Sequence, residues 1–224
     1  MKQLKFVLFI ALAFLTSCTA KITNDNSVGD LEATAYKTLS EKLIKDMKRE
    51  FNGNMYESEK ITPIETADGI KIGIPDGTAY LFAKDNSKYL KGDLNNDKKF
   101  DLIIRADMTE GRGLETKKYF VFLQGKEGYE YFAEFKADDM VFDNCRKMTA
   151  LKVGTFNLDS ISGGLLVGST NYQSTNESYY KDYSYRCDTE KYKINIKDKV
   201  TELVSQSDLL KKDSNTGKYE KVTK

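Results

Sequence analysis

The spacing of hydrophobic residues changes once along the chain, and this change predicts one helix followed by many strands. Between residues 31 and 51 apolar side chains recur every four positions, the period of a helix that buries one stripe. Asp30 is a residue type that caps helix N-termini, and Asn52 and Gly53 tolerate the left-handed conformation at a helix end. We therefore predict a helix over residues 30–53, with its apolar stripe packed against a sheet.

Beyond residue 55 the apolar positions form short runs separated by turn residues, a pattern typical of antiparallel strands. Residues 125–128 (Gly-Lys-Glu-Gly) separate two aromatic-rich runs and predict a hairpin. The predicted strands cover residues 70–74, 78–84, 102–104, 119–124, 129–136, 165–172, 179–187 and 192–196, with a short strand after residue 217. We predict a mainly β chain, an antiparallel meander of the propeller-like or sandwich kind. Residues 30–224 would form a single domain led by the one amphipathic helix.

The N-terminal residues have the organisation of an export signal. Lys2 and Lys5 precede an uncharged apolar run at residues 6–15, and Leu-Thr-Ser-Cys ends at Cys18. The run has ten residues, whereas a membrane-spanning helix needs about twenty. A cleaved signal peptide over residues 1–17 is therefore expected in place of a transmembrane anchor.

The Leu-Thr-Ser-Cys ending resembles the lipobox of bacterial lipoproteins. The resemblance implies that the Cys18 thiol carries a diacylglycerol and that its freed amine takes a third acyl chain. Several acyl chains anchor a protein firmly, whereas one binds only marginally. Residues 18–29 are polar and predict a flexible tether. The implied location is the bacterial cell envelope, on the outer membrane or facing the periplasm in a two-membrane cell. A plain cleaved signal with a chance cysteine is the alternative.

Composition excludes several functions. Without Lys2 and Lys5 the chain has 33 basic and 34 acidic residues, so no basic surplus indicates nucleic-acid binding. The chain contains no histidine, which excludes a Ser-His-Asp triad, a Cys-His pair and the usual zinc-binding histidines. It also contains no tryptophan, the strongest platform for stacking on sugars. A pair of carboxylates can still act as acid and base, because such a pair needs no histidine.

The cysteine count fits an exported protein. If the lipid takes Cys18, then Cys145 and Cys187 remain, and an even pair in an oxidising compartment predicts one disulfide. That bridge would close a loop of about 42 residues, worth about 4 kcal/mol in the chain-entropy model. Two unpaired thiols are the alternative.

One segment has oxygen-bearing side chains at the spacing of a calcium loop. Asp93, Asn95, Asp97 and Asp101 occupy loop positions 1, 3, 5 and 9, and Lys99 at position 7 can offer its backbone carbonyl. Carboxylate, amide and carbonyl oxygens are hard ligands, which suit calcium better than zinc or copper. The sequence therefore predicts a structural calcium site here.

The same segment resembles the Gly-Asp-x-Asn-x-Asp-Gly-x-x-Asp-Leu loop of FG-GAP/VCBS-type β repeats, which occur in many exported bacterial proteins. The resemblance implies that Asp93, Asn95, Asp97 and Asp101 are side-chain ligands and that a hydrophobic strand follows. Lys98 stands where the family has glycine, so it would strain a left-handed position and bring positive charge beside the ion. Weak affinity is expected. An Asx-rich turn without metal is the alternative.

These features favour a lipid-anchored, non-enzymatic binding protein of the cell envelope. By analogy with exported lipoproteins that carry a similar loop, the sharper subtype is an inhibitor or immunity-type protein acting against peptidoglycan hydrolases. Its partner would be an envelope protein or a peptidoglycan-related molecule. Two alternatives remain: a glycan hydrolase that uses a pair of carboxylates, and a purely structural envelope lipoprotein.

Overall fold

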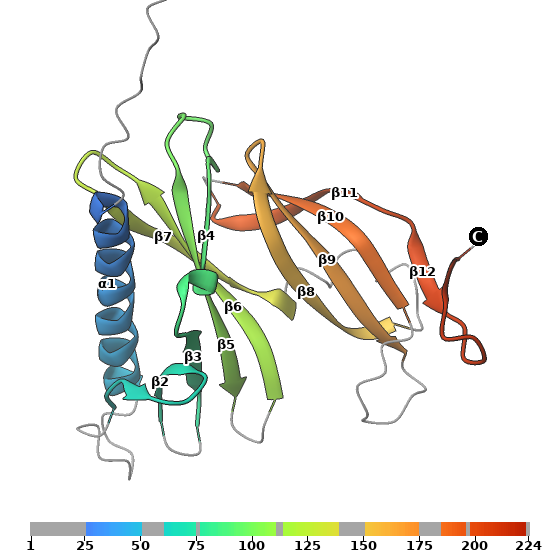
Figure 1. Cartoon of the computed structure of the whole chain (residues 1–224), viewed down its shortest axis with the longest axis horizontal. Helices are drawn as coiled ribbons and strands as arrows, with labels where there is room; N and C mark the ends of the chain where they lie inside the picture. The colour runs from blue at the N-terminus through green and yellow to red at the C-terminus, as the bar shows by residue number, and fades with distance from the viewer. Residues whose placement is uncertain are drawn as a thin grey trace, which may run out of the picture.

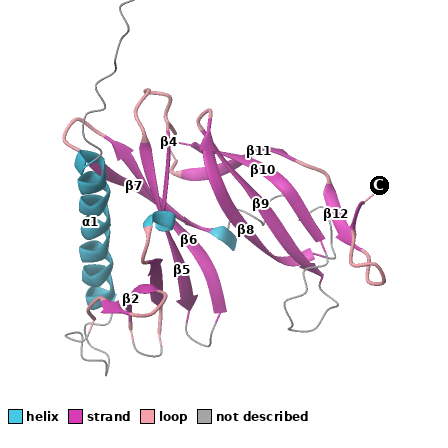
Figure 2. Ribbon diagram, in the orientation of Figure 1, coloured by secondary structure: helices cyan, strands magenta, loops and turns pink. Residues whose placement is uncertain are grey.

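The computed structural model confirms a mainly β fold with two antiparallel sheets and one long helix (Figures 1 and 2). The residues that it describes are 26–50, 61–74, 77–110, 114–138, 151–174, 185–195 and 198–222. Within these ranges no helix is long and apolar enough to cross a bilayer.

The helix α1 (Asn26–Glu50) has 25 residues and buries the stripe that the four-residue spacing predicted. Its buried apolar side chains are Ala35, Leu39, Leu43 and Met47. The helix begins four residues before Asp30, so residues 26–29 are helical and the prediction of Asp30 as the N-cap is wrong. The predicted end at residues 52–53 lies outside the described residues.

The first sheet lies directly against α1 (Figure 1). Its strand order is β1-β2-β3-β5-β6-β7, and β4 pairs with β5 beyond the end of β3. The strands are β1 (Ile64–Glu65), β2 (Gly69–Gly73), β3 (Ala79–Ala83), β4 (Tyr89–Gly92), β5 (Asp101–Glu110), β6 (Leu114–Gln124) and β7 (Tyr129–Lys136). A 3₁₀ turn, η2 (Asn86–Lys88), joins β3 to β4. The predicted hairpin at residues 125–128 is confirmed as the β6–β7 turn.

The second sheet has the order β13-β12-β10-β9-β8, and β11 pairs with part of β10. Its strands are β8 (Leu151–Ser162), β9 (Leu165–Ser174), β10 (Tyr185–Asn195), β11 (Val200–Gln206), β12 (Leu209–Lys212) and β13 (Tyr219–Lys221). The two predicted strands at residues 179–187 and 192–196 are not separate where the structure describes them, because β10 runs through both. The strands β1, β4, β8, β11 and β12 were not predicted.

The first sheet packs against α1 on one face and, around β5 and β6, against the second sheet on the other, so the protein has three layers: helix, sheet and sheet. Leu102, Ile104 and Phe120 face α1, where they join one hydrophobic core. Ile103 and Tyr119 point the other way, into a second core shared with the second sheet. Because side chains alternate along a strand, burial on both faces leaves β5 and β6 with continuous apolar runs. This packing brings β8 across β5 and β6.

Candidate functional site

The predicted calcium loop connects β4 to β5, and a hydrophobic strand follows it. Both oxygens of Asp93 accept backbone hydrogen bonds, from Asp97 N at 3.1 Å and from Lys98 N at 2.9 Å. The Asn95 side chain accepts from Asp97 N at 3.1 Å, and the Asp97 carboxylate accepts from Lys99 N at 2.9 Å. The side chains at positions 1, 3 and 5 therefore turn inward and fold the loop around themselves. Each acceptor oxygen keeps a second lone pair.

Asp101 lies at the base of the loop and is completely buried. Its carboxylate accepts from Leu94 N at 2.8 Å and from Gln124 N at 2.9 Å, so it ties the loop to the end of β6. Burial raises the pKa of Asp101 most; the two backbone hydrogen bonds lower it, and the negative charges of Asp97 and Asp93 raise it further. The structure therefore brings three carboxylates close enough to interact, with Asp101 turned toward the protein.

The loop contains two strained positions. Lys98 has φ 67° and Asn96 has φ 60°, so the prediction that Lys98 occupies a left-handed position is confirmed. The ammonium of Lys99 lies 3.3 Å from the Gln124 carbonyl oxygen and 4.0 Å from an Asp97 oxygen. It therefore brings positive charge near the Asp97 carboxylate.

The four predicted side-chain ligands differ in how they are directed. In the parts of the chain that the structure describes, no group of three or more histidine, cysteine or acidic side chains is arranged to hold a metal. Asp93, Asn95 and Asp97 face the loop interior, whereas Asp101 is committed to the backbone of β4–β5 and β6. The local loop conformation suits a cation, but the fourth side chain does not converge on it. Calcium binding remains a prediction.

The cysteine predictions fall largely outside the described residues. Cys18 and Cys145 both lie there. Cys187 is buried on β10, and the Gln206 side-chain amide lies 3.8 Å from its sulfur. The Cys145–Cys187 disulfide therefore stays a prediction.

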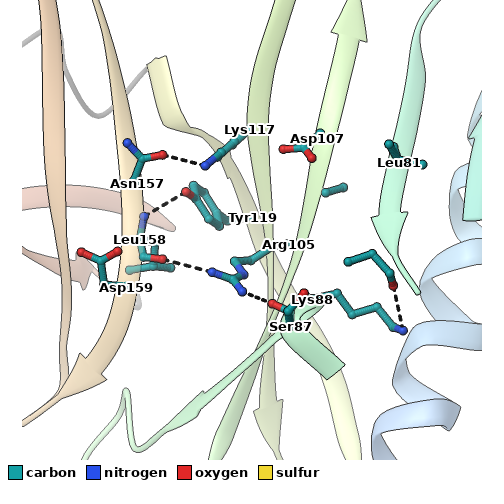
Figure 3. Close-up of a pocket in the computed structure, with 12 residues that line it drawn as sticks. Leu81, Ser87, Lys88, Arg105, Asp107, Lys117, Tyr119, Asn157, Leu158 and Asp159 are labelled. Carbon is teal, nitrogen blue, oxygen red and sulfur yellow. Dashed lines mark hydrogen bonds between the residues drawn. The ribbon is translucent and has the colours of Figure 1, made fainter. Parts of the chain in front are cut away.

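A cleft of about 370 Å³ lies where the two sheets diverge (Figure 3). Its floor is formed by β3, β5 and β6, and β8 and η2 supply its walls. The lining residues are Leu81, Ala83, Ser87, Lys88, Arg105, Ala106, Asp107, Lys117, Tyr119, Asn157, Leu158 and Asp159. This volume lies within the range of small-ligand sites, but most of the functional groups here are charged.

The cations of the cleft already have protein partners. Arg105 reaches between the walls and donates to the carbonyl oxygens of Ser87 and Leu158. Lys117 donates to the Asn157 side chain at 2.6 Å, again linking the first sheet to β8. Figure 3 shows both side chains extended across the cleft toward β8. These bonds fix the positions of the positive charges before any ligand arrives.

Lys88 is the most buried cation of the cleft. Its ammonium donates to the carbonyl oxygens of Ala83, at 3.1 Å, and Asp85, at 3.2 Å. It also lies over the rings of Tyr36 and Tyr89, which adds a cation–π attraction. Burial lowers the pKa of Lys88, and the Asp85 carboxylate partly offsets that effect. Lys88 therefore joins η2 to the helix side of the first sheet.

Tyr119 closes the back of the cleft. Its hydroxyl donates to the Phe156 carbonyl oxygen at 3.1 Å and accepts from Leu158 N at 3.0 Å. Burial raises the pKa of Tyr119 to about 12, mainly by desolvation of the ionised phenol. The hydroxyl thus satisfies two backbone groups of β8 and joins the two sheets.

The acidic residues of the cleft are Asp107 on β5 and Asp159 on β8. Asp107 is the cross-strand partner of Lys117, and Figure 3 shows its carboxylate beside that lysine. One signal of this site is present in the sequence. Arg105 and Asp107 follow Ile103 at every second position of β5, so their side chains lie on the same face as Ile103, toward the second sheet. Two charged side chains on the same strand face as a buried isoleucine indicate that the apolar packing is interrupted by a polar cleft there.

A second polar cluster that sequence reasoning missed surrounds Glu190, which is completely buried on β10. Its carboxylate accepts hydrogen bonds from the hydroxyls of Thr170, Tyr172 and Tyr192, the last two at 2.6 and 3.0 Å. The strand pairing of β10 shifts on both sides of this residue. These bulges turn Glu190 into the core of the second sheet.

No family model, curated protein or solved structure matches this chain. The cleft, the loop and the N-terminal sequence are therefore the features that bear on function.

Proposed function

We propose that the protein is a lipid-anchored, non-enzymatic binding protein of the bacterial cell envelope, of the inhibitor or immunity type. The lipobox-like ending at Cys18 supports the anchor. The observation that carries the binding role is the charged cleft between the sheets, whose cations are held by backbone and side-chain partners. Charges fixed in advance cost little to order when a partner binds.

The partner that suits this cleft is a protein with complementary charges. Arg105 and Lys117 supply the positive charges that face β8, and Asp107 and Asp159 provide opposite charges within the same cleft. Such a mixed pattern of charges favours one binding orientation of a partner, because other orientations would leave charged groups unpaired and weaken the binding. A peptidoglycan hydrolase is the proposed target class, resting on the analogy with exported inhibitors.

A paired capture experiment tests this proposal. The full mature chain and its Lys117→Glu variant are immobilised and exposed to envelope extract and to supernatants of competing bacteria. Lys193→Glu is the matched control, because Lys193 is exposed on β10 and does not line the cleft. We expect a hydrolase retained by the wild type and by Lys193→Glu but lost with Lys117→Glu, and inhibition of that hydrolase by the wild type. Equal retention by all three would exclude the cleft as the binding site.

We further propose that calcium stiffens the β4–β5 loop without taking part in chemistry. Three carboxylates within one short loop repel one another, and Asp93 and Asp97 both raise the pKa of buried Asp101. A bound cation would relieve that repulsion. Because Lys98 stands at the left-handed position where the family has glycine, the affinity should be weak, about 10⁻⁴–10⁻³ M.

One observation favours a second function, a carboxylate-based glycan hydrolase. Asp107 and Asp159 line the same cleft from opposite sheets, and a glycosidase requires two carboxylates in one cleft. Release of reducing sugars from peptidoglycan by the purified protein, lost in both Asp107→Asn and Asp159→Asn, would establish this function. If the protein retains no partner and releases no reducing sugar, a purely structural role is the remaining alternative.

A further inference from the structure

Several loops meet at the end of the molecule where α1 begins (Figure 1). The β6–β7 turn touches the start of the helix, since a Cβ at Gly128 would lie 3.7 Å from Leu31 Cδ2. The β4–β5 loop reaches the same turn through Lys99, and its Asn96 side chain abuts Gly164 in the β8–β9 turn. We call these three loops, residues 93–100, 125–128 and 162–164, the loop end.

The loop end presents an aromatic side chain to solvent. Phe100 is 67 % exposed, more than the other large hydrophobic residues in the described ranges, of which Ile64 and Val204 reach 55 %. Exposed Lys98 and Lys99 precede it, and exposed Lys126 lies on the neighbouring turn. An aromatic ring flanked by lysines suits a lipid interface, because the ring enters the boundary while the ammonium groups stay among the head groups.

The acidic residues of the loop end are Asp93 and Asp97 in the β4–β5 loop and the exposed Glu127 beside Lys126. The Asp93 and Asp97 carboxylates accept hydrogen bonds from the loop's own N–H groups, so they are directed into the loop. Asp101 is buried beneath it. Phe100, Lys98 and Lys126 are exposed at this end, and Lys99 is exposed while its ammonium also donates to the Gln124 carbonyl oxygen.

The length of chain before the helix limits how far this end can lie from a membrane. Cys18 and Asn26 are eight peptide units apart, which span at most about 29 Å when fully extended. We propose that the loop end rests on the lipid surface that carries the anchor, with Phe100 in the interface and Lys98, Lys99 and Lys126 among the head groups. This orientation rests on the proposed lipidation of Cys18. The end that holds β2 and the last turn of α1 then points away from the membrane (Figure 1).

The absence of tryptophan from the chain makes the test direct. In Phe100→Trp the only indole emission comes from the loop end. The lipidated full-length protein is reconstituted into phosphatidylethanolamine–phosphatidylglycerol vesicles, with and without brominated acyl chains. We expect a blue-shifted emission that loses intensity with the brominated lipid. Ile64→Trp is the matched control, because Ile64 is similarly exposed but pairs with β2 at the opposite end. Its emission should be unchanged.

Mass spectrometry of the N-terminal peptide separates the two proposals. An unmodified Cys18 would overturn the anchor and this orientation with it. A lipidated Cys18 with an unquenched Trp at position 100 would overturn the orientation alone. The orientation would also be overturned if the Trp emission responds to envelope proteins but not to vesicles, because Phe100 would then belong to a protein interface. Unchanged far-ultraviolet circular dichroism of both variants confirms that they fold.

Discussion

Removal of the Tyr119 hydroxyl should weaken the junction between the two sheets. Tyr119→Phe keeps the buried ring but deletes the group that accepts from Leu158 N and donates to the Phe156 carbonyl. Both backbone groups belong to residues that are almost completely buried. An unsatisfied buried polar group costs about 1–3 kcal/mol, so we expect a loss near 2 kcal/mol in the free energy of unfolding. For a chain of this size, that lowers Tm by about 4–8 °C.

The matched control is Tyr131→Phe, on the neighbouring strand. The Tyr131 hydroxyl donates to the Glu134 carboxylate at 2.7 Å in an exposed hydrogen bond between side chains, where water can replace it. Its loss should change stability by no more than about 0.5 kcal/mol. Thermal and urea unfolding followed by circular dichroism measure both variants. Equal Tm values for Tyr119→Phe and wild type would refute the reasoning that this hydroxyl carries the inter-sheet contact.

Alkaline titration gives a second readout of the same residue. The pKa of Tyr119 is about 12 in the fold against about 10 in an unfolded chain. Its contribution to stability is therefore complete below pH 10 and is lost as the pH rises through 12, because only the unfolded state ionises readily in that window. Tyr119→Phe should remove this part of the alkaline destabilisation. An alkaline unfolding profile identical to that of the wild type would contradict this.

Four further outcomes are expected. Cys18→Ser should move the protein from the membrane to the soluble fraction, and persistent detergent-sensitive pelleting would exclude the lipid anchor. Millimolar Ca²⁺ should raise Tm by more than Mg²⁺ does, since Mg²⁺ gives up its water reluctantly, and Asp97→Ala should abolish the rise. Identical Tm values with Ca²⁺ and with chelator would show that the loop is an acidic turn that binds no calcium. Lys98→Gly should stabilise the fold by about 0.5–1 kcal/mol, because glycine adopts φ 67° without strain, and a lower urea midpoint would contradict this. Thiol labelling of the denatured, unreduced protein should find neither Cys145 nor Cys187 reactive.

Local patterns predicted the parts of the fold that depend on neighbours in sequence. The buried stripe of α1 follows from the four-residue recurrence that includes Leu39 and Leu43, and the β6–β7 hairpin follows from its two glycines. The β4–β5 loop was also predictable, because its conformation is set by side chains that bond to N–H groups two to five residues away. The left-handed Lys98 is such a local consequence.

Features that depend on distant segments were not predictable. Strand β8 was missed because small and polar residues, including Gly154 and Asn157, interrupt its apolar positions. It is recognisable as a strand only through its neighbours: a Cβ at Gly168 would lie 2.6 Å from the Phe156 ring, so the glycine leaves room for that ring. The cleft exists because β8 crosses β5 and β6, and no single stretch of sequence records where Arg105 meets Leu158.

The double burial of the central sheet has a consequence for how this protein can change over time. Successive residues of β5, from Asp101 to Ile104, are completely inaccessible, with odd and even positions serving different cores. Substitutions are therefore restricted at both the odd and the even positions, because any new side chain must fit the packed residues on one face of the sheet or the other. Strand ends and turns carry no such restriction. New specificity in descendants of this chain should therefore arise by exchange of residues at the rims of the sheets, while the wall between the helix and the second sheet stays almost constant.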